Sequence, residues 1–219
     1  MRSGKRKPAE PERATARQAK SWPLRLLRNA LLWIVPVWAL WALAAPLYNA
    51  VLLRAGEAAL NVVERPDVTE LLLRQGGHDA YVARRDFPPA RTLVQGFRVT
   101  DLHFHLVLLG TLFLAVPGVP WRERLRNLGS ALFATVVFDL VLLVVYVEAV
   151  YATRLGAWSL AHYGAVARNL WGMAEHLLDL PVKLALPFAL WAGFYLKLLL
   201  PGAQSSLRTE APHRAAPRA

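Results

Sequence analysis

The sequence predicts an all-α membrane protein with four transmembrane helices, an extracytoplasmic amphipathic helix and a small β-rich extracytoplasmic cap. Hydrophobic residues make up 55% of the 219-residue chain and the mean hydropathy is +0.29, too apolar for an ordinary soluble domain. Several apolar runs are long enough to cross a bilayer. The excess positive charge lies outside those runs, which is typical of a multi-pass membrane protein.

The net charge of +11 is concentrated in three segments. Residues 1–28 carry +7, residues 121–127 carry +2 and the tail after Pro201 carries +2, whereas residues 54–101 hold seven arginines and seven acids. Because Lys and Arg gather on the cytoplasmic side, both termini and the 121–127 segment are expected in the cytoplasm. We expect a bacterial inner (cytoplasmic) membrane as the location, membrane lipid as a partner and no nucleic-acid partner.

The N-terminal part of the chain is expected to be a basic arm followed by a span. Residues 1–28 show no apolar period and are predicted to be a disordered cytoplasmic arm. The membrane domain is predicted over residues 29–202, and its first span at about residues 30–53. Ala42-Leu43-Ala44 matches a signal-peptidase site, so cleavage is an alternative; the long leader and the continuing apolar run favour a retained span.

Residues 55–100 are predicted to form the extracytoplasmic cap. Residues 55–64 continue the first helix as far as Arg65-Pro66. Gly76-Gly77 lies between two short β-prone runs, which indicates a hairpin, and residues 91–99 can add a third strand. So small a sheet needs a surface to pack on, and we expect it on the outer ends of the helices.

A hydrophobic hairpin supplies the second and third spans, at about residues 102–118 and 128–150. A Pro-Gly-Val-Pro sequence and the basic segment 121–126 separate them, and this segment is expected to be a cytoplasmic turn.

Residues 155–180 have the apolar period of an amphipathic helix, expected to lie at the membrane interface and to end at Pro181. The fourth span is expected at residues 182–200, with Lys183 and Lys197 reaching outward to the interfaces. A cytoplasmic tail follows over residues 203–219.

Polar residues in and beside the apolar runs are the candidate functional groups, because a carboxylate at membrane depth is costly. Asp139 is surrounded by apolar neighbours, so it must face the bundle interior, be protonated, or find a donor such as Thr135, Tyr146 or Tyr195. A buried tie between spans and a proton-relay or transport role are its two interpretations. Arg84-Arg85 and Arg91-Arg98 in the cap can bind a carboxylate or a phosphate headgroup; the alternative is a solvated cap in which seven arginines balance seven acids. The predicted partner- or substrate-binding residues are Asp101, His103, His105, Asp139, Glu148, Arg84 and Arg85.

Four histidines form an alternative metal or haem site. His103, His105, His162 and His176 are expected at the same outer level, and such ligands suit a transition metal or haem. The other interpretation is a set of interfacial histidines that bond loop carbonyls and water. If residues 100–105 are extended, Asp101, His103 and His105 share one side; if helical, Asp101 pairs with His105 and His103 points elsewhere. On the leading interpretation no cofactor is expected, and the absence of cysteine excludes a thiolate nucleophile.

The order of segments resembles the exosortase/archaeosortase group, most closely the small exosortase-associated membrane proteins. The resemblance is carried by Phe97-Arg-Val-Thr-Asp101-Leu-His-Phe-His105, by Arg122-Glu-Arg-Leu-Arg126, and by the polar residue within the following span. In that family a catalytic cysteine precedes the span that corresponds to residues 102–116, and an Asn-x-x-Arg element follows. Thr100 or Asp101 and Asp139-Leu-Val-Leu142 stand in those places here.

The resemblance therefore implies a non-catalytic accessory in an exosortase-type protein sorting and processing system. Its partner would be another membrane protein or a membrane-tethered substrate. The alternative from a different class is a membrane-embedded enzyme or carrier that holds a metal or haem with its outer His, Asp and Glu residues.

Overall fold

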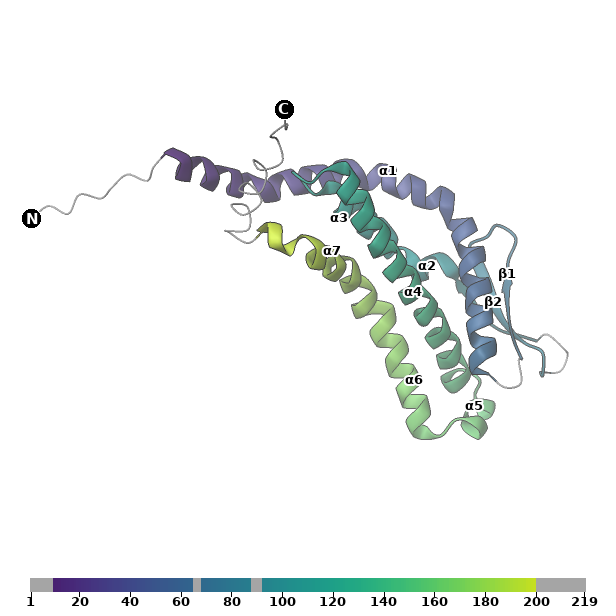
Figure 1. The fold of residues 1–219 in the computed structure, drawn as a ribbon. Coiled ribbons are helices and arrows are strands. Elements are labelled where there is room, and N and C mark those ends of the chain that lie inside the picture. The colour runs from purple at the N-terminus through teal and green to yellow at the C-terminus, as the bar shows by residue number, and fades with distance from the viewer. Residues whose placement is uncertain (1–9, 65–67, 88–91, 200–219) are drawn as a thin grey trace, which may run out of the picture.

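The computed structural model describes residues 10–64, 68–87 and 92–199, which form a mostly helical bundle with a small sheet at one end (Figure 1). In chain order the elements are α1 (Glu10–Val63), β1 (Thr69–Leu73), β2 (Asp79–Arg84), β3 (Thr92–Arg98), α2 (Val99–His103), α3 (His105–Ala115), α4 (Trp121–Thr153), α5 (Ala157–His162), α6 (Ala165–Leu177), the π-helix η1 (Leu178–Val182) and α7 (Lys183–Leu199).

The helices form four passes along the bundle: α1, then α2 with α3, then α4, then α6 with η1 and α7; the second pass is the shortest. Three contacts define one end. The Asn29 amide donates to the Ala115 carbonyl at 3.1 Å. Trp33 stacks on Trp121, and the ring centres of Trp22 and Trp191 lie 6.4 Å apart. The early part of α1, the turn between α3 and α4, and the C-terminal half of α7 therefore lie together, opposite the sheet.

Three helical segments are long and apolar enough to cross a membrane by length and composition: Trp22–Val63, Trp121–Thr153 and Ala165–Leu196. The second pass, Val99–Ala115, is shorter. Its 17 residues correspond to about 25 Å of helix, less than a hydrocarbon core of about 30 Å. The structure therefore establishes three membrane-length helices and a fourth, shorter apolar pass.

Helix α1 begins earlier than expected. Residues 10–28, predicted to be disordered, form its first turns, and their Ala, Arg, Glu, Lys and Gln content favours a helix. Residues 1–9 of the predicted arm lie outside the described residues. The helix bends along its length in Figure 1, and the prolines at 23, 36 and 46 inside it are the usual cause of such bends. It continues to Val63, as predicted, while Arg65-Pro66 falls outside the described residues.

The three predicted strands form one antiparallel sheet in the order β1-β2-β3. Gly76 and Gly77 both have positive φ, 105° and 73°, which explains why the β1–β2 turn needs glycine there. Leu71 and Val82 are paired across the two strands and join Val147 of α4 in the main apolar core. The prediction that the sheet packs against the helices is confirmed.

The last pass differs from the sequence prediction. A short helix, α5, ends at His162, and α6 then continues through η1 into α7 without a break at Pro181. The proline lies in the π-helical turn, where the wider ring of backbone bonds accommodates the residue that lacks an N–H. The prediction of one separate helix over residues 155–180 that ends at Pro181 is therefore wrong. The basic segment 121–126, expected to be a turn, forms the first turns of α4.

Candidate functional site

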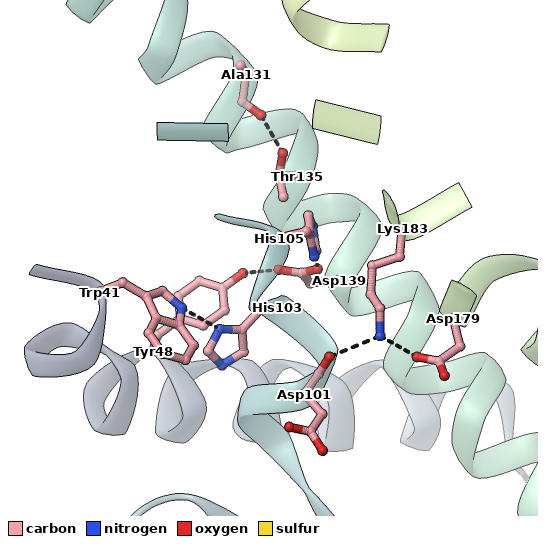
Figure 2. Close-up of polar contacts among 10 residues, drawn as sticks. All are labelled: Trp41, Tyr48, Asp101, His103, His105, Ala131, Thr135, Asp139, Asp179 and Lys183. Carbon is pink, nitrogen blue, oxygen red and sulfur yellow. Dashed lines mark hydrogen bonds and ion pairs between the residues drawn. The ribbon is translucent and has the colours of Figure 1, made fainter. Parts of the chain in front are cut away.

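A polar cluster lies inside the bundle, where the sequence placed Asp139. Figure 2 shows Asp139 of α4 between Tyr48 of α1 and His105 of α3. The Tyr48 hydroxyl donates to Asp139 Oδ2 at 2.6 Å, and His105 Nε2 lies 3.4 Å from Asp139 Oδ1. The side chains of His105 and Asp139 are fully buried. These three residues tie three helical passes together, and we call them the Asp139 cluster.

The donor that Asp139 uses is not one of the three expected. Thr135 bonds instead to the Ala131 carbonyl of its own helix, and Tyr195 accepts a hydrogen bond from Asn127. Tyr146 accepts one from Arg154. The sequence does show Tyr48 as a hydrogen-bond donor within the first apolar run. It does not show that the Tyr48 side chain faces Asp139.

His103 belongs to a second chain of hydrogen bonds beside this cluster. The Trp41 indole N–H donates to His103 Nδ1 at 3.2 Å, so Nδ1 is the acceptor and Nε2 carries the proton. His103 Nε2 then donates to Asn49 Oδ1 at 2.5 Å, and the Asn49 amide donates to the Gly77 carbonyl at 2.6 Å. Both ring nitrogens of His103 are therefore engaged, and the β1–β2 turn is fixed to the bundle.

The segment around Asp101 adopts neither of the two expected arrangements. Helix α2 ends at His103 and α3 begins at His105, so the helix is interrupted at Phe104. Because of this interruption, His103 and His105 both face the interior. Asp101 is exposed and lines a separate groove beside β2 and β3 of about 500 Å³.

The prediction that Lys183 reaches outward to the membrane interface is wrong. The same prediction for Lys197 falls outside the described side chains. Lys183 is only 5% exposed and points into the bundle (Figure 2). Its ammonium donates to the Asp101 carbonyl at 3.0 Å and to Asp179 at 2.5 Å, and lies over the Phe104 ring. The charge therefore joins the last pass to α2 instead of reaching outward.

A pocket of about 310 Å³ opens at the sheet end of the bundle. We call it the sheet-end pocket. Its lining comes from the end of α1, the end of β2 and the α5 region: Glu64, Val68, Arg84, Asp86, Trp158, His162 and Tyr163.

Arg84 is the most constrained side chain of this pocket. Its Nε and Nη2 donate to the two carboxylate oxygens of Asp86 at 2.9 and 2.8 Å, a bidentate pair. The guanidinium carbon also lies 4.6 Å from the Tyr151 ring centre, 4.7 Å from that of Trp158 and 5.1 Å from that of Phe87. The side chain is 9% exposed, so rings and carboxylate replace most of its water.

These contacts shift the ionisation of the pair in the expected directions. The hydrogen bond from Arg84 holds the pKa of Asp86 below its usual value. Burial acts to lower the pKa of Arg84, but the hydrogen bond and charge of Asp86 outweigh it and the pKa is raised. Both groups remain charged at neutral pH.

Glu148 lies next to the same pocket. The Tyr163 hydroxyl donates to Glu148 Oε2 at 3.1 Å. Burial, reinforced by the nearby Glu148 carboxylate, raises the pKa of Tyr163, so the phenol stays protonated and acts as the donor. Of the predicted binding residues, Arg84 lines the pocket and Glu148 is bonded to its lining residue Tyr163, whereas His105 and Asp139 meet in one buried cluster. Arg85 lies outside both groups, and its side chain is half exposed. Its guanidinium nitrogens lie 3.8 Å from a Glu70 carboxylate oxygen and 3.9 Å from a Glu57 carboxylate oxygen.

The four histidines proposed as metal ligands have separate neighbours. His162 stacks on Trp158 at the pocket, and His176 is exposed on α6, whereas His103 and His105 are buried in the bundle. Within residues 10–64, 68–87 and 92–199, no group of three His, Asp or Glu side chains could hold a metal ion. The arrangement does not support a metal or haem site shared by these histidines.

Comparisons with family models, curated proteins and solved structures find no match for this chain. Sequence reasoning missed Glu64, Trp158 and Tyr163 as pocket residues, since the end of α1 and the α5 region, far apart in the sequence, supply them.

Proposed function

We propose that this chain is a non-catalytic, multi-pass protein of a bacterial inner membrane that binds a membrane-tethered substrate or another membrane protein. We place it as an accessory in an exosortase-type protein sorting system. The observation that carries the binding role is the sheet-end pocket, whose central side chain, Arg84, is held by Asp86 and three aromatic rings. A site fixed before binding loses little conformational freedom when a partner arrives.

The lack of cysteine in the sequence and the fixed hydroxyl of Ser159 support a binding role. The chain has no cysteine, and Thr100 and Asp101 stand where the resembling family has one. Ser159, the serine nearest the pocket lining in sequence, is 2% exposed; its hydroxyl donates to the Tyr151 carbonyl and accepts from the Leu155 amide. A hydroxyl held this way by its own backbone has no adjacent base to activate it.

The proposed orientation places the sheet-end pocket outside the membrane. The described start of α1, the α3–α4 turn and the end of α7 share the opposite end, near the basic segments. Positive charge of this kind marks the cytoplasmic side. Four crossings follow if the second pass, at the lower limit of spanning length, is counted as a span.

The test is affinity purification of the tagged chain from native membranes. We expect an exosortase-type membrane protein or its substrate to co-purify with the wild type. Val68→Trp, which fills the pocket, should reduce the recovery at least about tenfold, a loss of roughly 1.4 kcal/mol in binding.

The matched control is Leu93→Trp, which adds the same ring at a 54% exposed position of β3 outside the pocket. It should leave recovery unchanged. Equal recovery with both variants, or no such partner with the wild type, would contradict the proposal.

A further inference from the structure

We infer that the sheet-end pocket receives an organic cation: the guanidinium or primary ammonium of an arginine or lysine side chain. The inference rests on the proposed function and names the chemical class of the group that the pocket binds. It reverses the expectation that the cap arginines bind an anion.

The arginines near the pocket are already neutralised. Asp86 occupies the bidentate face of Arg84 through two hydrogen bonds, and the rings of Tyr151 and Trp158 flank the guanidinium. Arg85 does not line the pocket. An incoming carboxylate or phosphate would have to displace Asp86, and would meet the charge of Glu64.

Glu64 is the acid of the lining that forms no ion pair within 4.0 Å among the described residues, and the charge of Arg84 acts on it only from a greater distance. Its Oε1 accepts a hydrogen bond from the Thr69 hydroxyl at 2.7 Å. Its Oε2 is buried and accepts no hydrogen bond from any residue that the structure describes. Since a buried carboxylate oxygen without a donor costs free energy, a cation that donates to it would be bound with a charge-assisted hydrogen bond.

The surroundings of Glu64 favour positive charge further. Asp86 is paired with Arg84, the aromatic residues Tyr163 and His162 belong to the lining, and the Glu148 carboxylate is bonded to the Tyr163 hydroxyl. The pocket already stabilises one guanidinium by the same means, since Arg84 lies among rings and beside a carboxylate. A volume of about 310 Å³ lies at the small end of ligand pockets and suits a single side chain.

The test measures binding of three fluorescent pentapeptides to the purified full-length protein in nanodiscs. The peptides are Gly-Ser-X-Ser-Gly, with arginine, its neutral analogue citrulline, or glutamate at X. We expect the arginine peptide to bind at least about tenfold more tightly than the citrulline peptide, and the glutamate peptide to bind most weakly.

Glu64→Gln keeps the shape of the side chain and the acceptor for Thr69, and should abolish the preference for arginine over citrulline. Glu57→Gln, on α1 and outside the pocket, is the matched control and should keep the preference. Equal binding of arginine and citrulline peptides, no binding of the arginine peptide, or an unchanged preference in Glu64→Gln would overturn the inference. The co-purification test decides the partner-binding role separately, because it does not depend on the charge of the ligand.

Discussion

Replacing Asp139 with alanine is expected to lower the free energy of unfolding by about 3 kcal/mol, because it leaves the half-buried Tyr48 hydroxyl without its acceptor and removes the carboxylate beside the fully buried His105. Tyr48 would lose the acceptor at 2.6 Å, and His105 the carboxylate at 3.4 Å. Hydrogen bonds between membrane helices are often weak, about 0.6 kcal/mol on average, because the separated helices find other partners. Here three passes share one carboxylate, so the loss should exceed that average. Denaturant titration in mixed micelles measures it.

Thr135→Val is the matched control for this prediction. Thr135 is buried one turn before Asp139 on α4, but its hydroxyl bonds only to the Ala131 carbonyl of the same helix. We expect a loss below about 1 kcal/mol there. Asp139→Asn should fall between the two, since its amide oxygen can still accept from Tyr48. A loss in Asp139→Ala no larger than in Thr135→Val would show that the Asp139 cluster does not tie the passes together.

Replacing Arg84 with methionine is expected to lower the free energy of unfolding by about 2 kcal/mol. Methionine keeps an unbranched apolar chain but removes the charge that lies over the rings of Phe87, Tyr151 and Trp158, each contact contributing on the order of 0.5–1 kcal/mol. Arg85→Met is the control: its side chain is 47% exposed with ionic contacts of 3.8 to 3.9 Å, and should change stability by less than about 0.5 kcal/mol. Comparable losses in the two variants would contradict the special role of Arg84.

The difference between the wild type and Arg84→Met should also depend on pH. Arg84 depresses the pKa of Asp86, so the pair stabilises the fold above the unfolded pKa of about 4 and loses that contribution as the pH falls through the lower folded value. The gap between the two unfolding curves should therefore narrow in acid, while the ring contacts preserve part of it. If the stability difference between the wild type and Arg84→Met widened in acid, the pairing of Arg84 with Asp86 would not be what stabilises the fold.

Part of this fold follows directly from local sequence signals. Gly76-Gly77 specified the hairpin because the turn needs two residues with positive φ. The run after residue 128 specified α4 because its apolar length exceeds the bilayer core.

Other features depended on tertiary contacts that hydropathy does not report. Pro181 did not end the helix, because a π-helical turn absorbs it. Tyr48 faces Asp139 because packing sets helix rotation. Lys183 points inward because the Asp101 carbonyl and Asp179 bind it there. The pocket itself joins residues from α1, β2 and the α5 region, and no spacing along the chain indicates such a meeting.

The most direct test of partner binding at the sheet-end pocket is photo-crosslinking in native membranes from a benzophenone amino acid at position 162. His162 lines the sheet-end pocket and is exposed; His176, exposed on α6 and outside the lining, is the control position. We expect a covalent adduct with an exosortase-type membrane protein or its substrate from position 162 and none from position 176. The same adduct yield from both positions, or no adduct from position 162, would contradict it.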